Sequence, residues 1–319
     1  MAAAAPIELD AEYRLLRGEA GFVRRPALRA LEVRGGDAIE FLDSQLTNDI
    51  ASLEPGGGCY AALLDRKGHL QSDLTVAVLD PERIWLLAEA EGAERLAAHL
   101  GMYRIGREVE VEGLDLELIS VIGPEARATL DLEALGPEHS HGPAVIAGVA
   151  TVRALVTAPG VDLAVAPARA EELAAALTAA GIPEASERAA EILRVEAGRP
   201  RLGPEMGTET MPAEAGIVEQ AVSFTKGCYI GQETVARLHY KGRPNRHLRG
   251  LRLEREARPG DAVQLDGREL GRIGTAALSP ARGPVALAIL RREAAPGSRV
   301  AVGEEGNAGE VVELPFGSA

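Results

Sequence analysis

The stretch from Lys226 to Glu233, Lys-Gly-Cys-Tyr-Ile-Gly-Gln-Glu, combines residue types that expose and activate a thiol. Cys228 is one of two cysteines in the chain, and Lys226 lies two residues before it. A cysteine acts as a nucleophile or metal ligand in its thiolate form, which a nearby ammonium group favours by charge attraction. Gly227 and Gly231 allow the backbone to bend sharply. The stretch therefore predicts a functional thiol at Cys228 with Lys226 as its partner; the alternative is a small buried hydrophobic residue.

The other cysteine, Cys59, follows three glycines in an apolar run, which favours a buried strand residue. Two cysteines provide no disulfide framework, and neither has the spacing of a zinc or cluster site. We therefore predict no metal site within the chain itself.

Two upstream segments extend the pattern of the octapeptide. They are residues 41–49, Phe-Leu-Asp-Ser-Gln-Leu-Thr-Asn-Asp, and residues 193–206, Leu-Arg-Val-Glu-Ala-Gly-Arg-Pro-Arg-Leu-Gly-Pro-Glu-Met. All three segments resemble motifs of the YgfZ-type folate-binding proteins, whose mitochondrial relatives assist iron-sulfur cluster assembly. That family in turn resembles the T-protein, the aminomethyltransferase of the glycine cleavage system.

The resemblance implies an α+β fold in which duplicated ferredoxin-like α+β units surround a central folate channel, followed by a small C-terminal β-barrel. The implied domains are residues 1–113, residues 114–246 with the octapeptide, and residues 247–319 for the barrel. The implied cofactor is tetrahydrofolate or a one-carbon derivative. The channel is implied by the resemblance alone.

Apolar periodicity supports the order of these elements. It predicts a strand at residues 28–33, a helix at 37–46, strands at 60–64 and 70–79 joined by a turn, and then a strand and a helix over 84–100. A similar order returns between residues 116 and 180. It includes a helix from Pro124 to about Leu135, a strand over 149–157, and a helix from Pro167 that ends before Gly181. Short strands beyond residue 247, with Asp266-Gly267 as a hairpin turn, predict a barrel or sandwich.

Three residues are assigned to the folate, two of them through the resemblance. Glu205 matches the T-protein acid that binds the pterin, and a carboxylate suits a ring that presents neighbouring N–H donors. Arg246 matches a basic residue that helps to hold the folate, and Tyr229 lies beside the cysteine. For Glu205 the alternative is an exposed acid near a turn.

One position departs from the T-protein pattern. There, two adjacent aspartates follow the glycine of the early hairpin, and one is implicated in folate-dependent transfer. Here the place reads Ser72-Asp73, so one acid is missing and glycine-cleavage activity is doubtful. Asp73 remains a candidate folate contact, with a solvated turn acid as its alternative.

Composition limits the classes of function. The formal net charge of −14 disfavours binding to nucleic acid or anionic membranes, which depends on an excess of lysine and arginine. The first ten residues lack the basic segment of a signal peptide, and no apolar stretch reaches the ~20 residues of a membrane helix. We therefore predict a cytoplasmic protein with no direct nucleic acid or membrane binding.

A local basic segment opposes the overall charge. It runs from Arg237 to His247 and continues to Arg249 and Arg252, directly after the octapeptide. We interpret it either as a solvated loop or as a clamp for the glutamate tail of a folate.

Three functional hypotheses remain open. The first is a tetrahydrofolate-binding accessory protein for assembly or repair of iron-sulfur clusters in client enzymes, including enzymes that thiolate tRNA. Cys228 would then carry a one-carbon adduct, a sulfur or a transient cluster ligand, and the last needs further ligands from a partner because one thiolate does not hold a cluster. The second is a folate-dependent aminomethyl or methyl transferase. The third is a folate-binding module in which Cys228 is incidental.

Overall fold

The computed structural model describes residues 8–150 and 153–317. The chain divides into two compact units, each assembled from several segments. The first contains residues 1–43, 49–60 and 74–190; the second contains residues 44–48, 61–73 and 191–319. Residues 44–48 of the N-terminal motif therefore belong to the same unit as the cysteine octapeptide.

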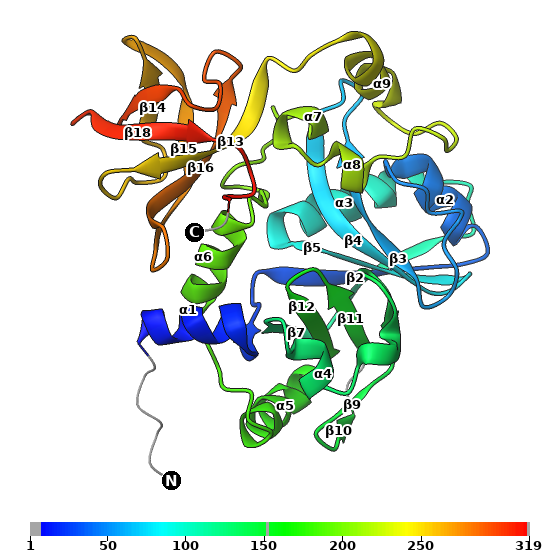
Figure 1. The fold of residues 1–319 in the computed structure, drawn as a ribbon. Helices are drawn as coiled ribbons and strands as arrows, with labels where there is room; N and C mark the ends of the chain where they lie inside the picture. Colours follow the sequence, from blue (N-terminus) through cyan, green and yellow to red (C-terminus); the bar gives the residue numbers. More distant parts are fainter. Residues whose placement is uncertain (1–7, 151–152, 318–319) are drawn as a thin grey trace. The chain divides into compact units, whose positions relative to one another are not determined.

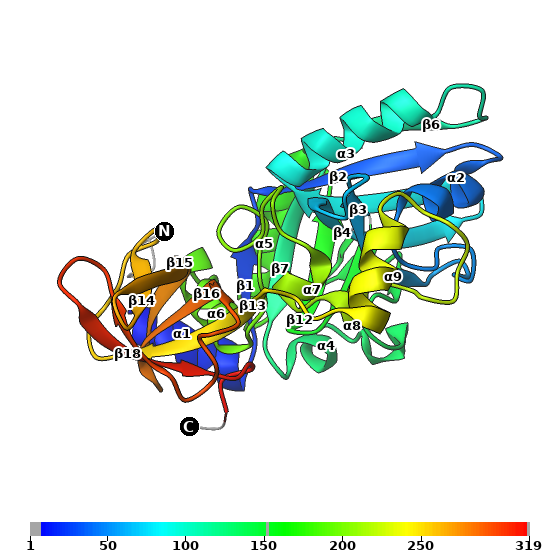
Figure 2. The ribbon, with the colours of Figure 1, turned by 90° about the horizontal axis from the view of Figure 1, so that it is seen from above.

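The first sheet has five strands in the order β3-β4-β5-β2-β6. Its strands are β2 (Leu28–Arg34), β3 (Gly58–Leu64), β4 (Leu70–Asp80), β5 (Arg83–Glu89) and β6 (Glu110–Leu114). The helix α3 (Ala90–Tyr103) lies along β2 (Figure 2), where Leu96 and Leu100 are fully buried. The helix α2 (Ala38–Gln45) precedes β3. The strands and helices predicted up to residue 100 are thus confirmed.

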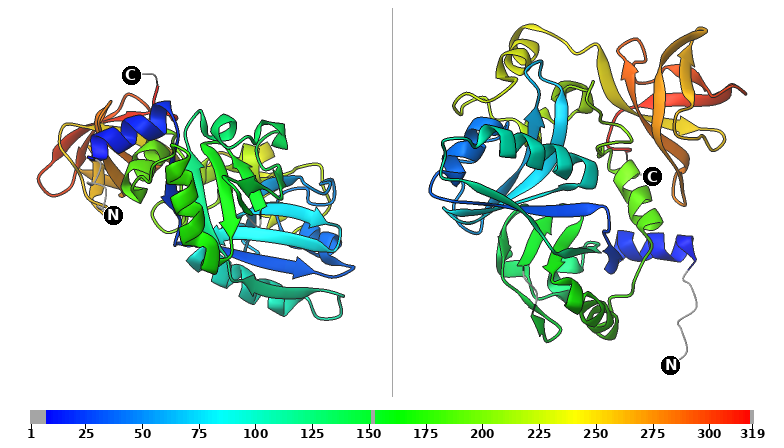
Figure 3. Two further views of the ribbon diagram at one scale, coloured as in Figure 1. Left: turned by 90° about the horizontal axis from the view of Figure 1, so that it is seen from below. Right: turned by 180° about the vertical axis from the view of Figure 1, so that it is seen from behind.

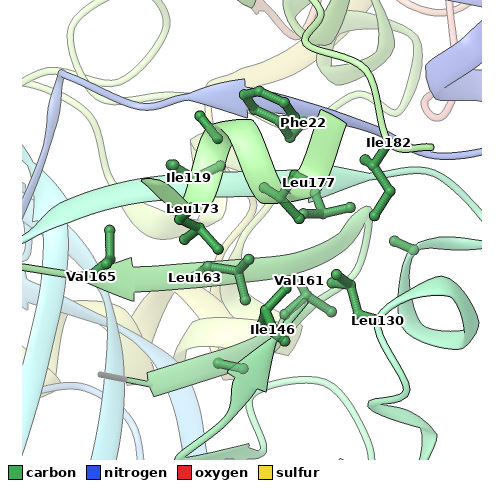
Figure 4. Close-up of a cluster of buried hydrophobic side chains, with 14 of the residues drawn as sticks. Phe22, Ile119, Leu130, Ile146, Val161, Leu163, Val165, Leu173, Leu177 and Ile182 are labelled. Carbon is green, nitrogen blue, oxygen red and sulfur yellow. The ribbon is translucent and has the colours of Figure 1, made fainter. Parts of the chain in front are cut away.

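The second sheet also has five strands, in the order β1-β7-β12-β11-β8. The helix α5 (Pro167–Ala179) lies against this sheet (Figure 3). Its Leu173 and Leu177 pack in one buried cluster with Ile119 and Leu163 of the central strands (Figure 4). Its strands are β1 (Gly21–Arg24), β7 (Glu117–Ile122), β8 (His141–Gly142), β11 (Arg153–Thr157) and β12 (Gly160–Val165). The helix α1 (Leu9–Gly18) precedes β1. The strand β1 was not predicted, and it pairs antiparallel with β7.

Two predicted elements of this region differ in the structure. In place of one helix from Pro124 to Leu135 there is a single turn, α4 (Ala126–Thr129), and a 3-10 turn (Glu133–Leu135). Asp131 lies between them with a φ of 56°, which no right-handed helix accommodates. The strand predicted over 149–157 is divided into β10 (Val149–Ala150), which pairs with β9 (Val145–Ile146), and β11; residues 151–152 lie outside the described residues.

Helix ends agree with the proline and glycine signals. The helix α5 (Pro167–Ala179) begins at Pro167, and Gly181 beyond its end has a φ of 87°. The Ser186 hydroxyl accepts the N–H of Ala189 at 3.3 Å and so caps α6 (Glu187–Glu196). Three further helices follow: α7 (Pro212–Ala215), α8 (Val218–Ala221) and α9 (Gln232–Lys241).

The C-terminal strands close into a barrel in the order β13-β16-β15-β14-β17-β18 (Figure 1). They are β13 (Arg246–Leu253), β14 (Ala262–Leu265), β15 (Arg268–Ser279), β16 (Gly283–Arg291), β17 (Arg299–Val302) and β18 (Asn307–Val312). Asp266 and Gly267 join β14 to β15 with φ values of 51° and 77°, as a tight hairpin turn requires. Two sheets with helices and a terminal barrel confirm the predicted α+β class.

Within the described part of the chain, no helix has both the length and the apolar character needed to cross a membrane.

Candidate functional site

The candidate site centres on residues 222–231, which connect α8 to α9 and are called the cysteine loop here. Cys228 is exposed on this loop, so the alternative of a small buried residue does not apply. Tyr229 next to it is buried, and burial raises the pKa of its hydroxyl to about 12. Cys59 lies in β3 as expected, although it is half-buried rather than buried.

Lys226 ties the cysteine loop to the N-terminal motif. Its Nζ donates hydrogen bonds to the backbone oxygens of Asn48 at 2.7 Å and Leu46 at 3.0 Å. It also lies 5.7 Å from the ring centroid of Tyr229. The Asn48 side chain adds a bond from its amide to the Gln220 oxygen at 3.0 Å. The ammonium group thus has a structural task beyond the electrostatic influence on the thiol predicted from the sequence.

Thr47 fixes the start of the cysteine loop. Its side chain is fully buried, and its hydroxyl donates to the backbone oxygen of Ala221 while accepting the N–H of Ala62 at 2.9 Å. The Thr47 oxygen accepts the N–H of Ser223 at 3.0 Å, which continues the contact into the loop. In the sequence this threonine is part of the motif at residues 41–49, and nothing there predicts these bonds.

The two glycines that flank Cys228 differ in their surroundings. Gly231 has a φ of 85°, and a Cβ added there would lie 2.6 Å from the backbone oxygen of Asp65. A Cβ added at Gly68 of the same hairpin turn would lie 3.1 Å from the Cβ of Thr234 in α9. A Cβ on Gly227 would meet nothing within 4 Å. Only Gly231 is therefore required for a close backbone approach, which seats the start of α9 on the turn between β3 and β4.

Glu205 lies in a buried ion pair. Its side chain has no exposed surface; one carboxylate oxygen accepts from Arg194 Nη1 and from the N–H of Arg201, each at 3.0 Å. The other oxygen accepts the hydroxyl of Thr275 in β15, and a Cβ on Gly274 would lie 2.9 Å from it. Binding a pterin through Glu205 would require exchanging one of these partners, so the assignment stays a prediction.

Arg246 forms a second ion pair, with Glu214 of α7. Its Nε and Nη2 donate to the two carboxylate oxygens of Glu214, each at 2.8 Å, and Nη2 also donates to the Glu209 oxygen. Glu214 also accepts the N–H of Met211 at 3.0 Å, which completes the first turn of α7. Glu214 was not predicted; the signal for it in the sequence is Pro212 at the first helical position with an acid two residues later.

The remaining candidate, Asp73, is half-buried in β4. Ser72 before it is fully buried, and its hydroxyl donates to the Asp73 oxygen at 3.2 Å. The strand begins with a bond from the Leu70 N–H to the Thr210 oxygen at 2.8 Å. Position 72 therefore presents a buried hydroxyl where the T-protein pattern has a second acid.

The predicted residues thus fall into separate groups. Cys228, Lys226 and Tyr229 share the cysteine loop, whereas Glu205 and Arg246 are held in two different ion pairs. Comparison with known proteins shows the family to which the chain belongs. Residues 6–226 match the family described as the GCVT N-terminal domain. The chain belongs to this family.

Several relatives match three quarters of the chain or more. An aminomethyltransferase of Rubrobacter xylanophilus is 30% identical over 97% of this chain and 86% of that protein. One of Streptomyces coelicolor is 32% identical over 96% of this chain and 88% of its own. An uncharacterized protein of Haemophilus influenzae is 27% identical over 76% of this chain and 78% of its own.

A solved structure extends the similarity to the fold. The glycine cleavage system aminomethyltransferase T of Bartonella henselae superposes with a TM-score of 0.87 at 26% identity. The match covers 98% of this chain and 90% of that one.

Proposed function

We propose that this protein binds tetrahydrofolate or a one-carbon derivative and serves as an accessory factor for the assembly or repair of iron-sulfur clusters in client enzymes, with Cys228 as its functional thiol. The observation that carries the proposal is the exposed thiol on a loop whose first half is tied down by Thr47 and Lys226. A thiol that serves only as packing does not need exposure or such an anchored loop.

The folate part of the proposal is supported by family membership and by one buried polar atom. Among the described residues, the hydroxyl of Tyr229 has no hydrogen-bond partner although the residue is only 7% exposed. A buried hydroxyl without a partner is costly and marks a place where a polar ligand atom fits. Tetrahydrofolate, when bound, supplies a reduced pterin and its one-carbon carrier nitrogens; Tyr229 and Asp73 are the side chains we assign to it, with Glu205 and Arg246 as further candidates.

The proposed role in iron-sulfur cluster assembly follows from the capacity of a single thiolate to act as one metal ligand. Cys228 supplies a single soft ligand, and a cluster needs several, so the client must contribute the others. Exposure of Cys228 meets this requirement, because a partner protein reaches it without local unfolding. A cytoplasmic setting, which we also propose, keeps such a thiol reduced. Enzymes that thiolate tRNA are among the clients we propose.

A second candidate function is folate-dependent aminomethyl transfer. It is favoured by the names of the Rubrobacter and Streptomyces relatives and by the similarity to the Bartonella enzyme. Against it stands Ser72, a buried hydroxyl that lacks the charge of the missing acid. Turnover of an aminomethylated lipoyl protein in the presence of saturating tetrahydrofolate would establish this function in place of the first.

Folate binding is tested by titrating the purified protein with tetrahydrofolate under anaerobic conditions. Tyr229→Phe removes one oxygen atom and is expected to weaken binding about fivefold, because a hydrogen bond to the cofactor is worth about 1 kcal/mol. Cys228→Ala is the matched control and keeps wild-type affinity. Equal affinity of wild type and Tyr229→Phe would show that Tyr229 does not contact the folate. Absence of binding by wild type would contradict the proposal that the protein binds tetrahydrofolate.

The thiol role is tested in a host strain that lacks the gene. Wild-type protein restores the activity of client iron-sulfur enzymes, whereas Cys228→Ala, which still binds folate, does not. Full restoration by Cys228→Ala would leave a folate-binding module in which the cysteine is incidental.

A further inference from the structure

The C-terminal half of α9 and Phe224 of the cysteine loop form a cluster of three aromatic rings. Phe224 stacks on His239 with ring centroids 4.0 Å apart, and Tyr240 meets both rings edge-on. Tyr240 is 67% exposed, and His239 is exposed as well. Tyrosine and other aromatic side chains are enriched where proteins meet, since they bury much area at low entropic cost. The cluster is thus an exposed surface with the composition of an interface, on the segment that carries Cys228.

Unpaired cations lie on the same helix and just beyond it. Arg237, Lys241 and Arg243 are exposed, and none of the three makes an ion pair with any described residue. Arg246 and Arg249 further along are already paired, with Glu214 and Glu313. We call the set of free cations and rings the α9 patch; its members are Phe224, Arg237, His239, Tyr240, Lys241 and Arg243.

The charge of the α9 patch opposes that of the rest of the chain. Residues 234–253 contain no aspartate or glutamate, whereas the whole chain carries 48 acids against 34 lysines and arginines. An acidic partner is therefore repelled by most of the surface and attracted at the α9 patch. Such a field orients a partner during encounter and raises the association rate. The orientation brings that partner to the segment that presents Cys228.

We propose that the α9 patch is the docking surface for a protein whose contacting face is acidic and carries at least one large apolar side chain. Its carboxylates pair with Arg237, Lys241 and Arg243, and its apolar side chain packs on Tyr240. The inference rests on the proposed function, because the docked protein is the client that shares Cys228. It adds the recognition surface that the proposed function leaves unspecified.

The number of free cations separates a protein partner from a nucleic acid. Sequence-independent binding to nucleic acid typically rests on about 6–10 neutralised phosphates, and three cations against a background of −14 fall well short. Three cations around an exposed tyrosine are ordinary for a protein interface, where a few aromatic and charged residues carry most of the affinity.

Docking is tested by fluorescence anisotropy with a fluorescein-labelled peptide of sequence (Glu-Phe-Glu-Glu) repeated three times. Wild-type protein is expected to bind it, and more weakly as salt rises. The double variant Arg237→Glu/Lys241→Glu is expected to weaken binding at least tenfold, and Tyr240→Ala at least threefold. Arg299→Glu reverses one charge, half of the change in the double variant, at a side chain that is 81% exposed in β17, and is expected to stay within twofold of wild type.

Four results of this experiment would overturn the proposal. They are equal binding by wild type and Arg237→Glu/Lys241→Glu, absence of salt-sensitive binding by wild type, tighter binding of a twelve-residue oligouridylate than of the peptide, and a parallel loss of tetrahydrofolate affinity in the double variant. The last would show that these cations hold the glutamate tail of the folate.

The same variants separate docking from the proposed function in the host strain that lacks the gene. Arg237→Glu/Lys241→Glu is expected to restore less than a third of client-enzyme activity, although its tetrahydrofolate affinity and the alkylation rate of Cys228 match wild type. Arg299→Glu restores it fully. Full restoration by the double variant would contradict docking at the α9 patch but not the proposed function. Full restoration by Cys228→Ala would contradict the thiol role. The peptide measurement tests the α9 patch independently of both results.

Discussion

The buried hydroxyl of Thr47 serves two backbone groups at once, the Ala221 oxygen and the Ala62 N–H. Thr47→Val keeps the shape and removes both bonds, so it leaves two buried polar groups without partners. We expect the free energy of unfolding to fall by about 2–4 kcal/mol, at about 1–3 kcal/mol for each unsatisfied group with some relaxation. Urea denaturation measures the loss.

Thr47→Ser is the matched control for this change. It keeps the hydroxyl and loses one methyl group, which costs about 1 kcal/mol. If Thr47→Val proves as stable as Thr47→Ser, the hydroxyl does not anchor the cysteine loop.

His141 gives the protein a specific sensitivity to acid. Its Nδ1 accepts from Arg153 Nη1 at 2.8 Å, and its Nε2 donates to the Gly57 oxygen at 3.0 Å. Burial and the neighbouring Arg153 charge lower the pKa of this buried histidine from 6.5 to about 4. Between pH 6.5 and 4, His141 therefore binds a proton in the unfolded chain but stays neutral in the folded chain. Stability is therefore expected to fall as pH drops from 6.5 to 4, by up to about 3 kcal/mol.

Urea denaturation at a series of pH values measures this dependence. His141→Gln should flatten the curve between pH 6.5 and 4. Identical slopes in this variant and in wild type would show that His141 does not titrate as described.

At the residue level the sequence predicted a functional thiol at Cys228 but did not indicate what the neighbouring Lys226 contacts. Cys228 and Lys226 are two residues apart, and the sequence therefore predicted that the lysine serves the thiol. The observed bonds of Lys226 run to Leu46 and Asn48, about 180 residues earlier, and no spacing pattern encodes such a pairing. The same applies to Glu205, whose contact with Thr275 depends on how the barrel closes.

At the level of elements, the junction between the hairpin turn at Asp65 and the start of α9 is held by Gly231. Gly231→Ala places a Cβ 2.6 Å from the Asp65 oxygen and forces a side chain into a left-handed conformation. We expect a loss of about 2 kcal/mol or more, since the conformation alone costs about 1–2 kcal/mol. The alkylation rate of Cys228 should change with it, because the displaced helix start carries the cysteine loop.

Gly227→Ala is the control on the other side of the cysteine. An added Cβ meets nothing there, so stability and alkylation are expected to stay near wild type. Peptide mapping by mass spectrometry distinguishes Cys228 from Cys59. Equal behaviour of the two alanine variants would contradict the close packing at Gly231.

Elements were predicted well where local chemistry decides them. Pro167 and Gly181 bound α5 because proline suits a first turn and glycine suits the left-handed position after a last one. Pro124 gives the same start signal, yet α4 is only one turn long. Nothing near Leu130 in the sequence marks a stop, and the left-handed Asp131 follows from tertiary packing around Leu130 and Leu132 in the core of the second sheet.

At the level of the whole molecule, the sequence predicted the order of most elements along the chain but not which distant segments pack together. The three predicted domains follow one another along the chain, and their boundaries stay a prediction. Contacts instead group residues 44–48 and 61–73 with residues 191–319. Residues 21–24 add a strand to the second sheet. Both are long-range pairings that apolar periodicity does not specify.

The C-terminal tail joins the barrel to α6 in one apolar cluster. Phe316 is 4% exposed and packs with Val195 of α6 and with Val285 and Leu287 of β16, while its N–H donates to the Glu196 oxygen at 3.1 Å. Removing this ring leaves a cavity that the surrounding strands fill only in part. Phe316→Ala is therefore expected to lower the free energy of unfolding by about 3–5 kcal/mol.

Leu278→Ala provides the comparison for Phe316→Ala. Leu278 belongs to the same barrel, in β15, but is 45% exposed, so its truncation should cost less than about 1 kcal/mol. Urea denaturation followed by circular dichroism measures both variants under the same conditions. If the cluster makes α6 and the barrel one cooperative body, Phe316→Ala shifts a single transition to lower urea. A separate early transition in Phe316→Ala, or a loss no larger than that of Leu278→Ala, would show that the tail does not join them.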